Sequence, residues 1–126
     1  MSIPVPVASL DEALAAYSYA YLLTVSDDGR PHAVAVLPRL TDGVLHASIG
    51  HRSGVNASTR PDGVSLVWPP TTAGGYSLII DGAAVVDGES ISVTPSKAVL
   101  HRPAPPETGA VEDGACGSDC VSVSLG

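Results

Sequence analysis

Residues 45–56, LHASIGHRSGVN, decide the fold that this chain is expected to adopt. Apolar and polar residues alternate up to residue 49, as in a strand with one buried face, and Gly50 then breaks the alternation. Ser53 can cap a short helix that extends through Ser58. The stretch therefore predicts a strand over residues 44–49, a turn, and a helix over residues 53–58.

The start of this predicted helix is also a candidate anion site. The first amides of a helix have no partner within it, and Arg52 adds a fixed charge that can hold a phosphate through two hydrogen bonds. Ser53 can donate a further hydrogen bond. The same residues are equally typical of an ordinary capped helix with a solvated arginine, so the stretch alone leaves both interpretations open.

Other segments of the chain alternate with the same period of two, and turn residues separate them. Turns are predicted at Asp27-Asp28-Gly29, Thr41-Asp42-Gly43 and Asp87-Gly88, and Asp81-Gly82 predicts a bend or bulge within a strand. The strands are predicted at residues 19–25, 32–37, 44–49, 64–68, 76–86 and 90–94. Short turns join the first three, which favours a meander.

These elements predict a mainly β fold. No connection is long enough for repeated parallel crossovers, so we expect a six-stranded antiparallel split β-barrel with short flanking helices. One of these helices is predicted near the N-terminus, where Ser9 and Glu12 fit a capping box. The barrel domain is expected to span residues 1–102, and residues 103–126, rich in Pro, Gly and acidic residues, to form an irregular tail.

Composition excludes some partners and favours others. The chain of 126 residues has a net charge of −7 and only six Lys and Arg, which are scattered, so we expect no nucleic-acid partner. It is 44% hydrophobic but only 15% charged, which favours an apolar surface covered by a partner. Residues 13–25 are apolar, but no cation precedes Arg30 and no apolar run reaches the roughly 20 residues of a membrane span, so we expect a cytoplasmic protein without a membrane partner.

Other catalytic patterns are weak. Cys116 and Cys120 could form a disulfide or bind a metal with Asp113 or Asp119, but two free thiols in a tail are the simpler interpretation. The four histidines show no His-x-x-x-His spacing, and no Gly-x-Ser-x-Gly motif is present. We therefore predict neither a metal site nor a serine nucleophile.

The order of strand, glycine, basic residue and short helix around Arg52 resembles the pyridoxamine 5'-phosphate oxidase-like family of FMN-binding split barrels. Residues 64–69, the spacing onward to Tyr76, and the apolar residues 78–80 before Gly82 also resemble that family's central strands. The resemblance covers about residues 19–93. It implies an FMN cofactor and a homodimer with the cofactor site at the subunit interface.

The resemblance also implies which residues hold the cofactor. Arg52 falls where the family uses a basic residue on the FMN phosphate, and Ser53 falls where a second basic residue is common. Tyr76 would contact the flavin across the dimer, unless it is an aromatic residue of the core. With the strand along the flavin ring and two pocket-lining residues, the implied set is His32, Ala33, Val34, Ala35, Val36, Ala47, Ser48, Arg52, Ser53 and Tyr76.

Two departures from the family concern the substrate. Leu37 stands where the true oxidases carry a basic residue, and residues 101–105 lack the aromatic and paired-arginine pattern of their closing segment. Pyridoxamine-phosphate oxidation is therefore not expected. Three functions stay open: an FMN-dependent oxidoreductase acting by hydride transfer on an unknown small molecule, a deazaflavin-dependent reductase, and a noncatalytic flavin-binding or storage protein.

Overall fold

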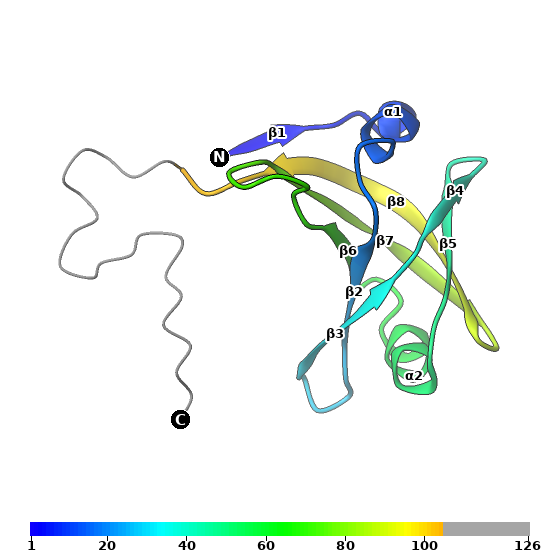
Figure 1. The fold of residues 1–126 in the computed structure, drawn as a ribbon. Coiled ribbons are helices and arrows are strands. Elements are labelled where there is room, and N and C mark those ends of the chain that lie inside the picture. Colours follow the sequence, from blue (N-terminus) through cyan, green and yellow to red (C-terminus); the bar gives the residue numbers. More distant parts are fainter. Residues whose placement is uncertain (105–126) are drawn as a thin grey trace, which may run out of the picture.

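A computed structural model describes residues 1–104 as one strongly curved antiparallel sheet of eight strands with short helical segments (Figure 1). The helical segments are η1 (Val7–Ser9), α1 (Leu10–Leu14) and α2 (His51–Thr59). The strands are β1 (Ser2–Pro4), β2 (Ala20–Val25), β3 (Pro31–Val36), β4 (Arg39–Thr41), β5 (Val44–Ser48), β6 (Val64–Trp68), β7 (Ser77–Asp87) and β8 (Ser90–His101).

The predicted mainly β, antiparallel class is confirmed, but the count of six strands is wrong, because the sheet has eight strands. The two additional strands, β1 and β4, have only three residues each, which is too short to show an alternating pattern. The predicted meander is also wrong, because β5 pairs with β4 and β8 while β3 pairs with β2. The sheet order is β3-β2-β6-β7-β8-β5-β4, so β3 lies at one end of the path.

The last strand is longer than predicted. We expected it to end at Thr94, before Pro95, but β8 continues to His101. Pro95 pairs with Gly82, next to the register shift between Asp81 and Gly82. Because a proline can occupy a strand at a bulge without breaking a regular ladder of hydrogen bonds, the predicted irregularity of β7 explains why β8 runs on.

The core fills the inside of the curved sheet. Buried residues alternate with more exposed ones along β2 and β6, as the period of two requires. The largest fully buried side chains are aliphatic: Leu10, Leu22, Leu45, Leu66, Leu78, Ile80, Ile91, Val64 and Val93, together with Thr24. At about 25 cal/mol per Å² of apolar surface removed from water, this burial is the main favourable term in folding.

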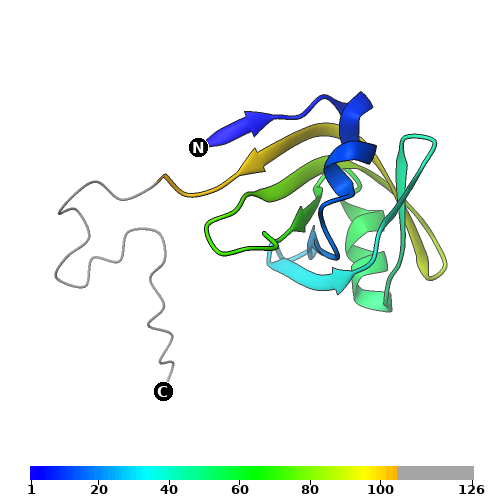
Figure 2. The ribbon, with the colours of Figure 1, turned by 45° about the horizontal axis from the view of Figure 1, so that its top comes forward.

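Helices α1 and α2 lie at opposite ends of the barrel (Figures 1 and 2). The N-terminal helix was predicted, but the Ser9 side chain makes no capping hydrogen bond, because the 3-10 turn before it carries the chain into α1. Helix α2 packs against β2 and β7. It begins two residues earlier than predicted, at His51, so Ser53 is not its cap.

A buried hydrogen bond fixes α2 to the sheet. The Asn56 side-chain amide donates to the Thr24 hydroxyl at 3.1 Å, and both residues are almost fully buried. Ser53, 2% exposed, lies on the same buried side of the helix. Moving α2 would break this hydrogen bond and leave two buried polar groups without partners, which is energetically costly. The contact therefore holds α2 in one position.

Residues 103–104, at the end of the described chain, have no regular secondary structure. The rest of the predicted tail, including Cys116 and Cys120, lies outside the described residues. Within residues 1–104, no helix has the length and apolar character to cross a bilayer.

Alanine substitutions at Gly82 in β7 and Gly54 in α2 test how closely these two elements are packed against their neighbours. A Cβ at Gly82 would collide with the Thr94 carbonyl oxygen and lie 2.7 Å from a Val93 methyl, whereas a Cβ at Gly54 would meet only side chains at 3.6 and 3.7 Å. We expect Gly82→Ala to destabilise by about 1–3 kcal/mol or more, and Gly54→Ala to stabilise by about 0.5–1 kcal/mol through helix propensity. Urea unfolding of both variants measures the change in the free energy of unfolding. Equal changes in the two variants would contradict the packing described.

The substitution Tyr17→Phe tests the hydrogen bond that links the N-terminal segment to the sheet. Its hydroxyl donates to the Tyr76 carbonyl oxygen at 2.8 Å, and burial raises the pKa of Tyr17 above its ordinary value of 10.0. Because the pKa of Tyr17 is raised in the folded state, the protonated hydroxyl contributes fully to folding stability below pH 10. This contribution is lost as the pH rises through the pKa of the folded state. We expect Tyr17→Phe to cost about 0.5–1.5 kcal/mol near neutral pH and to weaken the alkaline loss of stability, as followed by urea unfolding across pH. A loss of stability independent of pH would contradict this assignment.

Candidate functional site

An open groove of about 420 Å³ lies between β3 and the segment where β5 ends and α2 begins. The inner face of β3 forms one wall, and the first residues of α2 form the other. Its size falls within the roughly 300–1,000 Å³ of small-molecule pockets. Its lining residues are His32, Val34, Ala35, Val36, Ser48, Ile49, Gly50, His51, Arg52 and Ser53.

Most of the residues predicted to hold a cofactor line this groove, which we call the β3–α2 groove. They are His32, Val34, Ala35, Val36, Ser48, Arg52 and Ser53. Ala33 alternates to the outer face of β3, where it is exposed, and Ala47 lies with Ser48 and Arg39 in a neighbouring recess. The fold therefore brings together predicted site residues from two separate strands, β3 and β5, and from helix α2.

The start of α2 gives one end of the groove a positive potential. Gly50 is the N-cap and has no side chain to satisfy the first amides, and the first turn contains no acidic residue. Helix amides and the helix dipole both attract anions at such a terminus. Arg52 is exposed beside it, and the ion pair found within residues 1–104 joins Arg30 to Asp28, so the Arg52 guanidinium has no carboxylate partner there.

Strand β3 supplies a different kind of surface. It is an end strand that pairs with β2, so its other backbone edge is left without a sheet partner. Unpaired backbone N–H and C=O groups at a sheet edge can bind the polar edge of a ligand. Val34 and Val36 add an apolar wall on the inner face, so the groove offers both kinds of contact to a flat, partly polar ring.

His32 is the polar side chain on this apolar wall. Its Nδ1 atom is buried and has no hydrogen-bond partner among residues 1–104. A buried polar atom without a partner is costly and is normally satisfied by protein, water or ligand. His32 therefore lines the groove while one of its ring nitrogens is buried and has no protein partner within residues 1–104.

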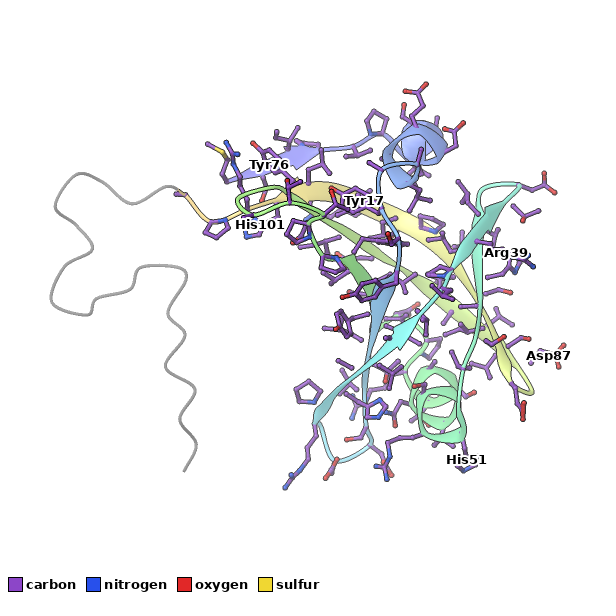
Figure 3. The ribbon with its side chains drawn as sticks, viewed as in Figure 1. Tyr17, Arg39, His51, Tyr76, Asp87 and His101 are labelled. Carbon is purple, nitrogen blue, oxygen red and sulfur yellow. The ribbon has the colours of Figure 1, made fainter. Side chains whose placement is uncertain are left out.

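His51 was missed by the sequence analysis. It lines the groove at the first position of α2 and lies at the end of the barrel where this helix packs (Figure 3). Placing the helix start at Ser53 left His51 in a turn. Gly50 was the available signal, because an N-cap glycine would have put both His51 and Arg52 in the first turn.

Tyr76 lies at the other end of the barrel, next to Tyr17 (Figure 3). Its hydroxyl donates to the Met1 sulfur at 3.5 Å, and the Arg102 guanidinium lies 4.4 Å from its ring centroid. Within one chain, Tyr76 does not line the β3–α2 groove. Its predicted contact with the flavin would have to come from a partner subunit, and this stays a prediction.

No group of three or more His, Cys, Asp or Glu side chains within residues 1–104 is arranged to hold a metal ion. The lining of the β3–α2 groove includes serines and histidines but no Asp or Glu, so it does not hold a serine, histidine and carboxylate set. What its residues offer is anion binding at one end and ring binding along β3.

Comparison with known proteins gives close relatives in sequence. The chain is 39% identical over 138 aligned residues to the uncharacterized protein Mb0449c of Mycobacterium bovis, with 96% of each chain covered. It is equally similar to the uncharacterized protein MT0457 of Mycobacterium tuberculosis. No protein-family model matches the chain.

Solved structures share the fold at lower identity. A candidate pyridoxamine 5'-phosphate oxidase from Listeria innocua is similar with a TM-score of 0.60 and 18% identity, over 75% of this chain and 96% of that one. An FAD-binding protein from Mycobacterium smegmatis is similar with a TM-score of 0.57 and 14% identity, over 81% of this chain and all (100%) of that one.

Proposed function

We propose a flavin-binding function for this chain, which belongs to the family of the mycobacterial proteins Mb0449c and MT0457 and has the pyridoxamine 5'-phosphate oxidase-like split-barrel fold. The observation that carries the proposal is the positively charged start of α2 opening onto the free edge of β3. The ligand would be the FMN moiety, which the two commonest flavin cofactors, FMN and FAD, share.

The phosphate would lie at the start of α2. The first amides of the helix are not satisfied by a cap side chain, and Arg52 can add a charge-assisted hydrogen bond. Ser53 is uncharged, so it cannot supply the charge that a second basic residue would give at this position. Arg52 would therefore carry most of the electrostatic affinity.

The isoalloxazine ring would lie along β3. Val34 and Val36 offer it an apolar surface, and the unpaired backbone edge can form hydrogen bonds with its polar rim. The imidazole of His32, which lines the groove, can form a hydrogen bond with a polar atom of the ligand. These three features fit a ring that is flat, apolar on its faces and polar at its edge.

When bound, the flavin would supply the hydride chemistry of an oxidoreductase, and the chain would bind and orient it. A deazaflavin-dependent reductase and a noncatalytic storage protein remain the alternatives. Leu37, 73% exposed, offers no charge to a phosphorylated substrate, which supports a reaction other than pyridoxamine-phosphate oxidation. The cytoplasmic location stays a prediction.

We also propose a homodimer with the site at its interface. On the outer face of β2 and around β3, Tyr19, Tyr21 and Leu37 are 38%, 40% and 73% exposed. The Tyr19 and Tyr21 rings pack edge to face with centroids 5.5 Å apart, so they form a single apolar surface. This surface lies on the strand pair that forms a wall of the groove, so a second copy packed on it would lie next to the site.

Arg52→Ala tests the phosphate site. Because a charge-assisted hydrogen bond contributes about 1.5–3 kcal/mol, we expect FMN affinity to fall about tenfold to a hundredfold. Titration of the full chain with FMN, followed by flavin fluorescence at fixed ionic strength, measures the change. Circular dichroism checks that the fold is intact.

The matched control is Lys97→Ala, which removes an exposed cation on β8 that does not line the β3–α2 groove. We expect it to leave FMN affinity almost unchanged, because salt screens distant surface charges. Arg39 is a poorer control, since it shares a recess with Ala47 and Ser48. Equal losses for Arg52→Ala and Lys97→Ala would sink the assignment of Arg52 to the phosphate.

Tyr21→Glu tests the interface. A carboxylate in the centre of the apolar surface would lose its hydration on association, so we expect the dimer to dissociate to monomers at micromolar concentration and flavin affinity to fall with it. Sedimentation velocity measures the dissociation of the dimer. Val7→Glu, at a residue 42% exposed in η1, should leave the dimer intact. A wild-type chain that sediments as a monomer would rule the proposal out.

A further inference from the structure

A recess next to the β3–α2 groove lies where β4, β5 and β8 pair side by side. Its volume is about 370 Å³. We call it the Arg39 recess. Its lining residues are Leu37, Arg39, His46, Ala47, Ser48 and Ser90.

Every polar side chain that lines the Arg39 recess can donate a hydrogen bond, and none of them is acidic. Arg39 and His46 are partners across β4 and β5, and Ser48 and Ser90 are partners across β5 and β8. All four residues are exposed. The chain contains 13 Asp and Glu and has a net charge of −7, yet an anion in this recess would meet donors and no lining carboxylate.

The Arg39 side chain makes no contact that explains it within the described chain. It projects from β4 to the outside of the barrel (Figure 3), and neither the side-chain hydrogen bonds nor the ion pair found within residues 1–104 involve it. Glu89 precedes Ser90 in the chain and is exposed, but it does not line the recess. The guanidinium therefore has its charge and its planar set of donors available for a ligand.

His46 is held in position by its neighbour on β8. The His46 Nδ1 atom and the Ser92 hydroxyl share a hydrogen bond of 3.1 Å. When the hydroxyl donates to Nδ1, the ring proton of the neutral imidazole lies on Nε2, which can then donate to a ligand. Arg39 and His46 together offer several donors but one permanent charge, which matches a carboxylate more closely than a doubly charged phosphate.

The Arg39 recess adjoins the proposed flavin site. Ser48 lines both the recess and the β3–α2 groove. Leu37 lines the recess, is 73% exposed, and directly follows Val36, which lines the groove. A molecule with its carboxylate on Arg39 and an apolar body on Leu37 would therefore reach the groove. Leu37 also belongs to the apolar surface proposed for the second subunit, so the recess would lie at the edge of that interface.

From this arrangement we infer that the Arg39 recess binds the carboxylate of a small molecule with an apolar body, and that this molecule is the substrate that meets the flavin. Arg39 would hold the carboxylate through two parallel hydrogen bonds, and His46 and Ser48 would donate to its remaining lone pairs. The carboxylate site stands on the recess alone, whereas the substrate role rests on the proposed flavin function.

The first test titrates the full wild-type chain, freed of flavin, with benzoate, benzamide and phenyl phosphate, and follows the NMR signals of the backbone amides. We expect benzoate to shift the signals of the recess residues with a dissociation constant on the order of 1 mM. Benzamide, which lacks the charge, should bind at least tenfold more weakly, and phenyl phosphate no more tightly than benzoate.

Three results of this titration would overturn the inference. They are no binding of benzoate, benzamide binding as tightly as benzoate, and benzoate shifts confined to the start of α2. Phenyl phosphate binding at least tenfold more tightly than benzoate would overturn the choice of a carboxylate.

The second test uses Arg39→Ala, which removes the guanidinium without breaking a side-chain contact found within residues 1–104. We expect benzoate affinity to fall at least about tenfold, because charge-assisted hydrogen bonds are lost. Arg39→Lys keeps the charge but not the planar fork and should restore only part of the affinity. Lys97→Ala, at an exposed cation on β8 outside the recess, should leave benzoate affinity unchanged. Equal losses for Arg39→Ala and Lys97→Ala, with the fold intact by circular dichroism, would contradict a specific site.

The third test adds benzoate to the chain loaded with FMN and records the absorption spectrum of the bound flavin. We expect a spectral change that saturates with benzoate in the wild type and is absent in Arg39→Ala. Benzoate binding in the recess without a spectral change would overturn the substrate role and leave the carboxylate site. A chain that binds no FMN would overturn the proposed flavin function and the substrate role with it, while the titration of the flavin-free chain still decides the carboxylate site.

Discussion

The buried hydrogen bond from Asn56 to Thr24 is the contact on which the arrangement of the site depends. It joins α2 to β2, the neighbour of β3, across 3.1 Å in the core. A buried donor or acceptor without its partner is expensive, so α2 has little freedom to rotate or withdraw. The start of the helix therefore stays next to the inner face of β3, and the β3–α2 groove exists because these two surfaces are held apart and facing each other.

The position of β3 at one end of the sheet has consequences on both of its faces. Its inner face gives His32, Val34 and Val36 to the groove, and its outer face continues the exposed apolar surface around Tyr21. A closed barrel would pair the free edge of β3 and remove the place where a ligand ring can bind. An edge strand is usually a risk of aggregation, and here a ligand on one side and a second subunit on the other would cover it.

Local charge matters more in this chain than its net charge of −7. The start of α2 has no acidic residue in its first turn, and Arg52 adds a cation there. The acidic residues Asp27 and Asp28 belong to the β2–β3 hairpin, where Asp28 is paired with Arg30. Screening limits the reach of surface charges to about 10 Å, so an acidic protein can still hold a phosphate at one helix terminus.

Local sequence patterns were enough to predict the strand alternation, the turns at Gly29, Gly43 and Gly88, the bulge at Gly82 and the cationic strand-to-helix turn at Arg52. All of these are local, because they depend on the period of side chains and on residues near each turn. Strand pairing was decided only by the tertiary structure, since β5 had edges available on β3 and on the distant β8, and no local pattern distinguishes them. The same reason applies to the site: that His51 faces the groove, that Ser53 is buried and that Tyr76 lies at the opposite end follow from how distant segments pack against one another.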